Sequence, residues 1–232
     1  VATAPQLKTE LENVAPGPIL YAPNGVELER SAPSISRTSM REQWGCGHDE
    51  LVIGYLGRVD PVKNCPLLAD ACQAMGDRTL LVMYGAPTPW PEAASSIIAT
   101  MEARLGTRLR IYPATDDVGS VLHAIDVFML PSHSEVMSFS LLEAWAAGVP
   151  VVATRVGAIP SLERDYGQLV APIAPNATPL ELRNAIDLAL SSTEGSQMTV
   201  RAKRMVDSCF RADQFGERWT QLIQHALKHT RH

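Results

Sequence analysis

The fold of this chain is decided by residues 126–154, which read DVFMLPSHSEVMSFSLLEAWAAGVPVVAT. The opening apolar run stops at Pro131 and predicts a buried strand that leads into a polar loop. Residues 139–147 predict a helix that ends before Gly148, and the apolar run 149–153 predicts a second strand. Together they form a βαβ unit. Its loop lies beyond the carboxyl end of the first strand, where open parallel sheets bind their ligands.

Two carboxylates lie within this unit, eight residues apart: Glu135 in the loop and Glu143 in the helix. The helix N-terminus between them offers unpaired N–H groups and a partial positive charge, which suit a phosphate. Structural roles are equally compatible with the pattern, because Glu143 could complete a capping box with Ser140 and Glu135 could be an exposed loop acid. The residues alone leave both alternatives open.

Strands and helices alternate along the rest of the chain. Apolar runs predict further strands at residues 19–22, 51–56, 79–84, 109–112 and 168–170. Helical patterns are found at residues 65–75, 92–105, 116–125, 179–190, 197–210 and 214–228. This alternation is not divided by any linker, and it predicts an α/β fold with one doubly wound, Rossmann-like parallel sheet of about six or seven strands.

The composition excludes several classes of function. The chain has 232 residues and a net charge of -5 without a compensating basic run, so we expect no nucleic acid as a partner. No apolar run approaches the ~20 residues of a membrane-spanning helix. The four cysteines lack the spacing of a zinc site or a disulfide framework, and no Asp-x-Asp is present to hold a divalent cation. We therefore expect a cytoplasmic protein with reduced thiols and no metal site.

A second loop at the carboxyl edge of the predicted sheet carries two cations. It runs from Gly57 to Asn64, after the strand at 51–56, and contains Arg58 and Lys63. Arginine binds a diphosphate as a fork and lysine as a point charge, so this loop and the Glu135 loop could together cradle a diphosphate. The alternative is that both side chains are solvated loop charges, and the residues alone favour neither interpretation.

The order of these motifs resembles the C-terminal half of the retaining, nucleotide-sugar-dependent glycosyltransferases of the GT-B fold, in family four. Glu135 and Glu143 match the family's Glu-x7-Glu motif. Gly57 and Arg58, followed by Lys63, match its basic loop. The remaining matches, in chain order, are Pro23-Asn24-Gly25-Val26, residues 126–132, Gly148-Val149-Pro150, Gly157 with Pro160, and Gly167 with Leu169-Val170. The resemblance covers most of the chain.

The resemblance implies a role for each matched residue. Arg58 and Lys63 would hold the donor diphosphate and stabilise it as the leaving group, while Glu135 would contact the transferred sugar. Glu143 would bind the ribose hydroxyls. The other implied substrate contacts are Gly57, the backbone N–H groups of Val136, Met137, Ser138 and Phe139, and the strand end at Ile111 and Tyr112 beside the base. Such enzymes transfer the sugar with retention and need no metal and no cofactor besides the nucleotide-diphosphate sugar.

The chain departs from this family in several motifs, among them Gly85-Ala86-Pro87 for the usual Gly-Asp-Gly, Ala158 for a Gly and Ser161 for a Glu, and it departs in length. The family usually has Gly-Phe-Gly after the first Glu, where this chain has Val136-Met137-Ser138. A GT-B enzyme has two Rossmann-like domains, and residues 1–232 correspond to the donor-binding domain alone. We expect residues 214–232 to form a terminal helix that packs on a missing N-terminal acceptor domain.

The resemblance also defines the expected partners and the competing functions. The partners would be a nucleotide sugar, an unidentified acceptor and the chain's own N-terminal domain, and peripheral membrane association of the whole enzyme stays open. Two other functions are compatible with the sequence: a non-catalytic nucleotide-sugar binding module, or another GT-B enzyme such as an epimerase or phosphorylase. The ordered set of two cations and two glutamates disfavours the epimerase or phosphorylase.

Overall fold

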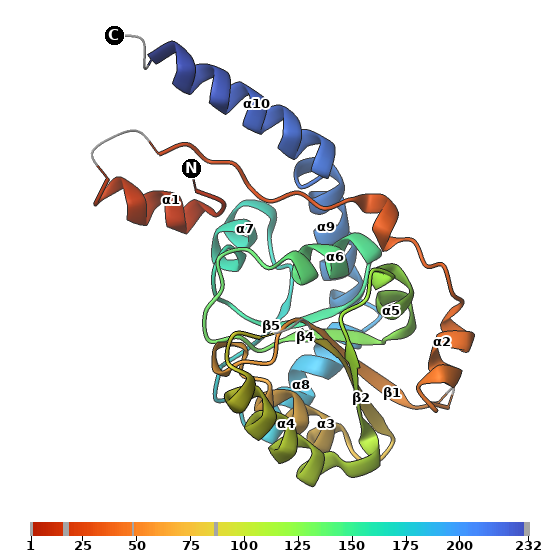
Figure 1. The fold of residues 1–232 in the computed structure, drawn as a ribbon. Coiled ribbons are helices and arrows are strands. Elements are labelled where there is room, and N and C mark those ends of the chain that lie inside the picture. The colour runs from red at the N-terminus through yellow and green to blue at the C-terminus, as the bar shows by residue number, and fades with distance from the viewer. Residues whose placement is uncertain (1, 16–18, 48, 86–87, 230–232) are drawn as a thin grey trace.

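The computed structural model describes residues 2–15, 19–47, 49–85 and 88–229, and in them it shows the predicted α/β fold (Figure 1). Six parallel strands form one sheet in the order β3-β2-β1-β4-β5-β6. The strands are β1 (Leu51–Leu56), β2 (Thr79–Gly85), β3 (Leu109–Pro113), β4 (Val127–Leu130), β5 (Val151–Thr154) and β6 (Ala171–Ile173). The chain therefore changes its winding direction between β1 and β4, and doubly wound sheets bind ligands at such a switch point.

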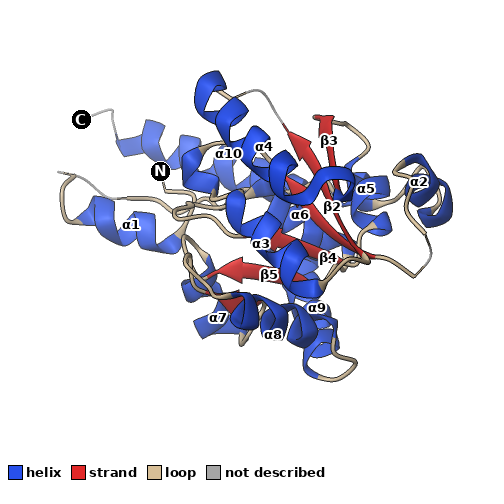
Figure 2. Ribbon diagram, turned by 90° about the horizontal axis from the view of Figure 1, so that it is seen from below, coloured by secondary structure: helices blue, strands red, loops and turns tan. Residues whose placement is uncertain are grey.

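Helices cover both faces of this sheet (Figure 2). On one face α3 packs against α4 and α8, and on the other α5 packs against α6. The helices are α1 (Pro5–Glu12), α2 (Arg37–Gln43), α3 (Pro66–Met75), α4 (Pro91–Leu105), α5 (Val118–Ala124), α6 (Phe139–Ala147), α7 (Ile159–Tyr166), α8 (Pro179–Leu190), α9 (Glu194–Cys209) and α10 (Ala212–His229). The described residues also form the short 3-10 helices η1 (Leu28–Ser31), η2 (Pro61–Lys63) and η3 (Gly106–Arg108).

The core lies on both sides of the central strands. Ile53 in β1, Leu81 in β2 and Phe128 in β4 have no exposed surface. Every residue of β4 and β5 is buried. Because a parallel sheet is covered on both faces, its strands are continuous apolar runs rather than alternating ones. This is why short apolar runs located the strands β1 to β5 in the sequence.

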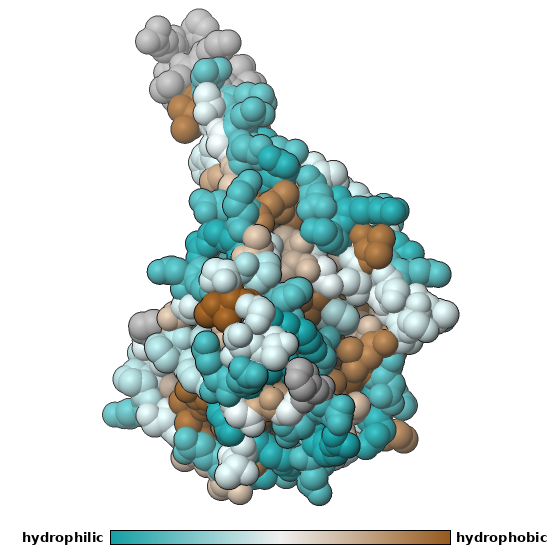
Figure 3. All heavy atoms as spheres, turned by 90° about the vertical axis from the view of Figure 1, so that its right-hand side faces the viewer, coloured by the Kyte–Doolittle hydropathy of each residue, from teal (hydrophilic) through white to brown (hydrophobic). Residues whose placement is uncertain are grey.

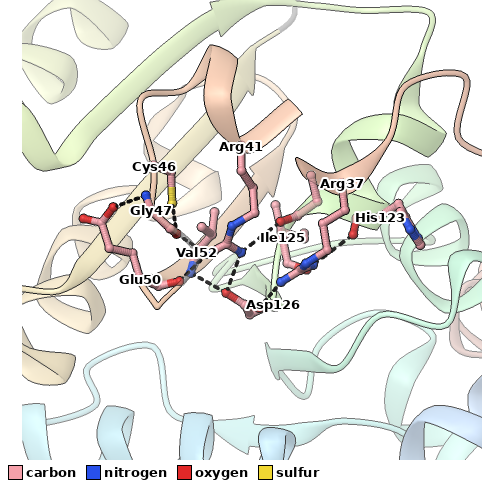
Figure 4. Close-up of polar contacts among 10 residues, drawn as sticks. Arg37, Arg41, Cys46, Gly47, Glu50, Val52, His123, Ile125 and Asp126 are labelled. Carbon is pink, nitrogen blue, oxygen red and sulfur yellow. Dashed lines mark hydrogen bonds and ion pairs between the residues drawn. The ribbon is translucent and has the colours of Figure 1, made fainter. Parts of the chain in front are cut away.

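The amino-terminal edge of the sheet is held by a partly buried ionic cluster (Figure 4). Asp126, just before β4, accepts hydrogen bonds from Arg37 and Arg41 of α2, and its Oδ2 lies 2.7 Å from the backbone N of Val52. Arg41 is 4% exposed and also donates to the backbone carbonyls of Gly47 and Ala124. The cluster joins α2 to β1 and β4 by hydrogen bonds, at the edge of the sheet opposite to the carboxyl ends of the strands.

Several predicted elements differ from the structure, and α9, for instance, begins at Glu194, three residues before its predicted start. The last strand begins at Ala171 and not near residue 168, because the N–H groups of Leu169 and Val170 donate to the Glu163 carboxylate instead of a neighbouring strand. Residues 19–22 form no strand, and Tyr21 makes only an isolated bridge with Ala2. Asp117, not Asp116, caps α5, because its carboxylate accepts from the backbone N–H of Ser120.

The helix α10 projects from the body of the domain (Figures 1 and 3). It begins at Ala212, two residues before the predicted start.

On the face drawn in Figure 3, hydrophobic residues form separate patches among hydrophilic ones. Within the part of the chain that the structure describes, no helix combines the length and the apolar character needed to cross a membrane.

Candidate functional site

A cavity of about 380 Å³ opens at the carboxyl ends of β1, β2 and β4. Eight of the predicted site residues line it: Gly57, Arg58, Lys63, Glu135, Met137, Ser138, Phe139 and Glu143. Val136, Ile111 and Tyr112 do not line it. A wider depression of about 690 Å³ along α9 contains none of the predicted residues. The cavity at the strand ends is therefore the place where the predicted chemistry converges.

The basic loop after β1 is shaped by hydrogen bonds to its own backbone. The buried Asp60 caps η2, because its Oδ1 lies 3.1 Å from the backbone N of Lys63. The Tyr55 hydroxyl donates to the carbonyl of Arg58 at 2.6 Å. Asn64 ends η2 in a left-handed conformation, with φ of 53°, and its amide donates to the carbonyls at positions 131 and 175. These contacts place Arg58 and Lys63 at the mouth of the cavity.

The Arg58 side chain is only loosely held. Its Nη2 lies 3.6 Å from Asp60 Oδ2, and its Cζ lies 6.0 Å from the centre of the Trp90 ring. The side chain is 43% exposed, whereas that of Asp60 is 1% exposed. Asp60 Oδ2 makes no hydrogen bond among the described residues. The guanidinium is thus near a buried carboxylate on one side and keeps N–H donors available for a ligand.

Lys63 and Glu135 meet in the cavity, although 72 positions separate them in the sequence. Lys63 Nζ lies 2.6 Å from Glu135 Oε1, and the buried Ser132 hydroxyl donates to the same oxygen at 2.7 Å. The side chains of Lys63 and Glu135 are 17% and 11% exposed. For these two residues, the alternative of a solvated loop charge is therefore wrong.

The N-terminus of α6 does not form the capping box of Ser140 and Glu143 that the sequence left open. Ser138 is the N-cap, and its hydroxyl accepts from the N–H of Leu141 at 3.3 Å. Glu143 lies beyond the first turn and cannot complete a capping box with Ser140. Among the described residues, no hydrogen-bond or ion-pair partner contacts the Glu143 carboxylate. Burial raises the pKa of this carboxyl, and the Arg30 guanidinium opposes the shift.

The loop between Glu135 and α6 accommodates its side chains without backbone strain. Asn64 is the only residue other than glycine with a positive φ in the described ranges, so Val136, Met137 and Ser138 adopt ordinary conformations. The loop rests on Gly157, whose φ is +63°, and a Cβ there would lie 2.7 Å from the carbonyl oxygens of Glu135 and Val136. Glycine at 157 lets this segment pack directly against the loop.

Two further contacts hold the same loop. The N–H of Ala158 donates to the carbonyl of Val136 at 3.0 Å. The amide of Asn24 donates to the carbonyl of Met137 at 3.4 Å. These partners lie 22 residues after Val136 and 113 residues before Met137, so the loop is positioned by segments that only the fold brings together.

An aromatic pair lies at the end of β2 and β3. The rings of Tyr84 and Tyr112 stack with centroids 5.0 Å apart, and Trp44 Nε1 donates to the Tyr84 hydroxyl at 3.2 Å. Tyr84 lines the cavity, whereas Tyr112 lies behind it and Ile111 is half-buried. Sequence reasoning missed Tyr84. Its place just before Gly85 at a strand end was the available signal, but only the order β3-β2-β1 puts that end beside the basic loop.

The arrangement suits an anionic ligand that also carries hydroxyl groups. Arg58, Lys63 and the N-terminus of α6 supply positive charge and N–H donors at one cavity. The free carboxylate of Glu143 accepts hydrogen bonds and therefore suits hydroxyl groups. Within the described ranges, no three His, Cys, Asp or Glu side chains lie close enough to hold a metal ion together.

Comparison with known proteins gives a family for most of the chain. The sequence profile of the family described as glycosyl transferases group 1 matches residues 36–205. The D-inositol 3-phosphate glycosyltransferase of Geodermatophilus obscurus is 34% identical over 157 residues, which are 63% of this chain and 35% of that protein. The one of Actinosynnema mirum is 31% identical over 176 residues, 70% of this chain and 42% of that protein. The matches thus span 35% and 42% of the length of these relatives.

Solved structures share the fold over nearly the whole chain. Sucrose-phosphate synthase from Thermosynechococcus elongatus gives a TM-score of 0.80 at 23% identity, covering 98% of this chain and 58% of that one. Anabaena HepE, crystallised in complex with UDP-glucose, gives a TM-score of 0.82 at 20% identity, covering 97% and 63%. At these identities the likeness shows a common fold.

Proposed function

The chain belongs to the glycosyl transferases group 1 family, and from this premise we propose that it is the donor-binding part of a retaining glycosyltransferase. The substrate bound here is a nucleoside diphosphate sugar. One observation carries the proposal: a single cavity at the switch point of the sheet brings together two cations, a helix N-terminus and two carboxylates. The UDP-glucose in Anabaena HepE supports the same class of ligand.

Different residues of the cavity bind the diphosphate, the ribose, the sugar and the base of the donor. Arg58, Lys63 and the first N–H groups of α6 hold the diphosphate. Glu143, whose carboxylate has no protein partner among the described residues, accepts hydrogen bonds from the two ribose hydroxyls. Glu135 contacts the transferred sugar. The base lies toward the ends of β2 and β3, where the Tyr84 ring forms the wall of the cavity.

These contacts assist the breaking of the bond between the sugar and the diphosphate. Negative charge grows on the departing diphosphate oxygen, and the guanidinium, the ammonium and the helix N–H groups stabilise it there. The acceptor oxygen forms the new bond at the face of the anomeric carbon that the diphosphate leaves, and its proton passes to the departing diphosphate oxygen. The residues of this chain supply the charge stabilisation, and no metal is needed for it.

The acceptor is bound by a second domain that packs against the mouth of the cavity. The fraction of the curated relatives that the chain matches supports this proposal, as does α10, which projects from the domain. In the proposed enzyme, residues 1–232 correspond to the donor domain, and α10 packs on the acceptor domain. The free cysteines are consistent with a cytoplasmic enzyme.

Calorimetric titration with UDP, GDP, ADP and their glucose conjugates tests the proposal. Replacing Arg58 with Ala removes a charge-assisted contact to the diphosphate and should cost about 1.5–3 kcal/mol of binding free energy. Arg78→Ala is the matched control, because this arginine is 72% exposed and precedes β2 at the opposite edge of the sheet. Equal affinities of the two variants for every nucleotide would show that Arg58 is not a ligand contact.

A further inference from the structure

Lys63, the cation assigned to the diphosphate, already has an anionic partner within the protein. Its Nζ lies 2.6 Å from Glu135 Oε1. Both side chains are less than one fifth exposed, at 17% and 11%, so solvent screens their attraction only weakly. A diphosphate that takes Lys63 must therefore compete with Glu135 for it.

Binding of Lys63 to a phosphate is unfavourable for the Glu135 carboxylate, which loses a partner. When the ammonium turns to a phosphate, the Ser132 hydroxyl is the one donor to the carboxylate that the described residues still provide. The phosphate also brings a second negative charge close to the first. A carboxylate that is 11% exposed is poorly solvated by water, so both changes are unfavourable.

A sugar on the diphosphate offsets this cost. Its hydroxyl groups are hydrogen-bond donors, and in the proposed function they lie against Glu135. They replace the ammonium as partners of the carboxylate. A nucleoside diphosphate without the sugar brings no donor to this position. Both unfavourable changes at Glu135 therefore lower the affinity for the sugar-free nucleotide.

We propose that the Lys63–Glu135 ion pair makes the site select a nucleoside diphosphate sugar over the sugar-free nucleoside diphosphate. This inference rests on the proposed function and adds a role to it. After transfer, Glu135 has lost the sugar hydroxyls and draws Lys63 back from the diphosphate. The product nucleotide then keeps Arg58 alone of the two cations, and its release is favoured.

A double-mutant cycle tests the pair directly. Glu135→Gln keeps the shape of the side chain and removes its charge, so we expect the variant to bind UDP, GDP or ADP about tenfold more tightly than the wild type. Binding of the glucose conjugate should change much less, and the preference for the conjugate should fall accordingly. In a Lys63→Met background, Glu135→Gln should improve nucleotide binding by less than about threefold, since the pair is already broken.

Ser132→Ala provides the matched control. It removes the other donor to Glu135 Oε1 but leaves the ion pair in place, so it should not tighten nucleotide binding. Thermal unfolding of each variant establishes that it is folded before its affinity is compared.

The outcomes separate this inference from the proposed function. Unchanged or weaker nucleotide binding by folded Glu135→Gln would overturn the role of the ion pair, and so would an equal gain in the Lys63→Met background. Arg58 is not part of the pair, so weakened binding in Arg58→Ala would leave the proposed function standing in either case. A wild-type chain that binds none of the nucleotides or conjugates would overturn both.

Discussion

Replacing Gly157 with Ala should damage both stability and sugar-nucleotide binding, because this glycine supports the loop that carries Glu135. Its φ of +63° lies in the left-handed region, where a Cβ costs about 1–2 kcal/mol. The new Cβ would also lie 2.7 Å from the carbonyl oxygens of Glu135 and Val136. These oxygens belong to the backbone, so relief requires the loop to move.

A second glycine variant separates the cost of the left-handed conformation from the cost of the clash with the loop. Gly148 has a left-handed conformation with φ of 71° and ψ of 34°, and a Cβ there would meet only the Lys203 side chain, at an ordinary 3.6 Å. Gly148→Ala should therefore show the conformational cost alone, about 1–2 kcal/mol. Gly157→Ala should lose a further ~1–3 kcal/mol, the usual range for an overpacked site.

Urea unfolding measures both free energies, and calorimetry measures binding of the sugar nucleotides. We expect Gly157→Ala to bind the glucose conjugate more weakly than Gly148→Ala does, since displacement of the loop moves Glu135 away from the sugar. Equal losses of stability in the two variants, with wild-type binding in both, would refute the claim that Gly157 supports this loop.

Two further predictions concern charge. Burial raises the pKa of Glu143, so its contribution to stability is present at acid pH and is lost as pH rises through that raised pKa. Glu143→Gln should accordingly raise the Tm at pH 7 but not at pH 4 and should weaken nucleotide binding at pH 7, and a lower Tm at pH 7 would contradict this. Asp126→Asn leaves the buried Arg41 without its anionic partner and should cost about 3 kcal/mol in urea unfolding. Nucleotide affinity should persist in the folded protein, because the Asp126 cluster lies at the opposite edge of the sheet.

The sequence by itself determined most of the secondary structure and the sheet edge at which the candidate site lies. The predicted bounds of β1, α6 and α8 agree with the structure, because buried parallel strands are apolar throughout and Pro or Gly marks many of the helix ends. The edge of the sheet that carries the site followed from the alternation of strands and helices. At two of the boundaries that failed a side chain binds the backbone: Glu163 before β6 and Asp117 at the start of α5.

The tertiary structure decided what each charged side chain does. In the sequence, Lys63 and Glu135 were separate loop charges, and only the pairing of β1 with β4 brings them to 2.6 Å. The same pairing places Glu143 in the cavity without a protein partner among the described residues, while Ser138 caps α6. Gly157 leaves room for the carbonyl oxygens of Glu135 and Val136, which lie 2.7 Å from the place of a Cβ at a position 22 and 21 residues further along the chain. Local patterns report the state of one segment, whereas the partners of a charge depend on which distant segments the sheet order makes neighbours.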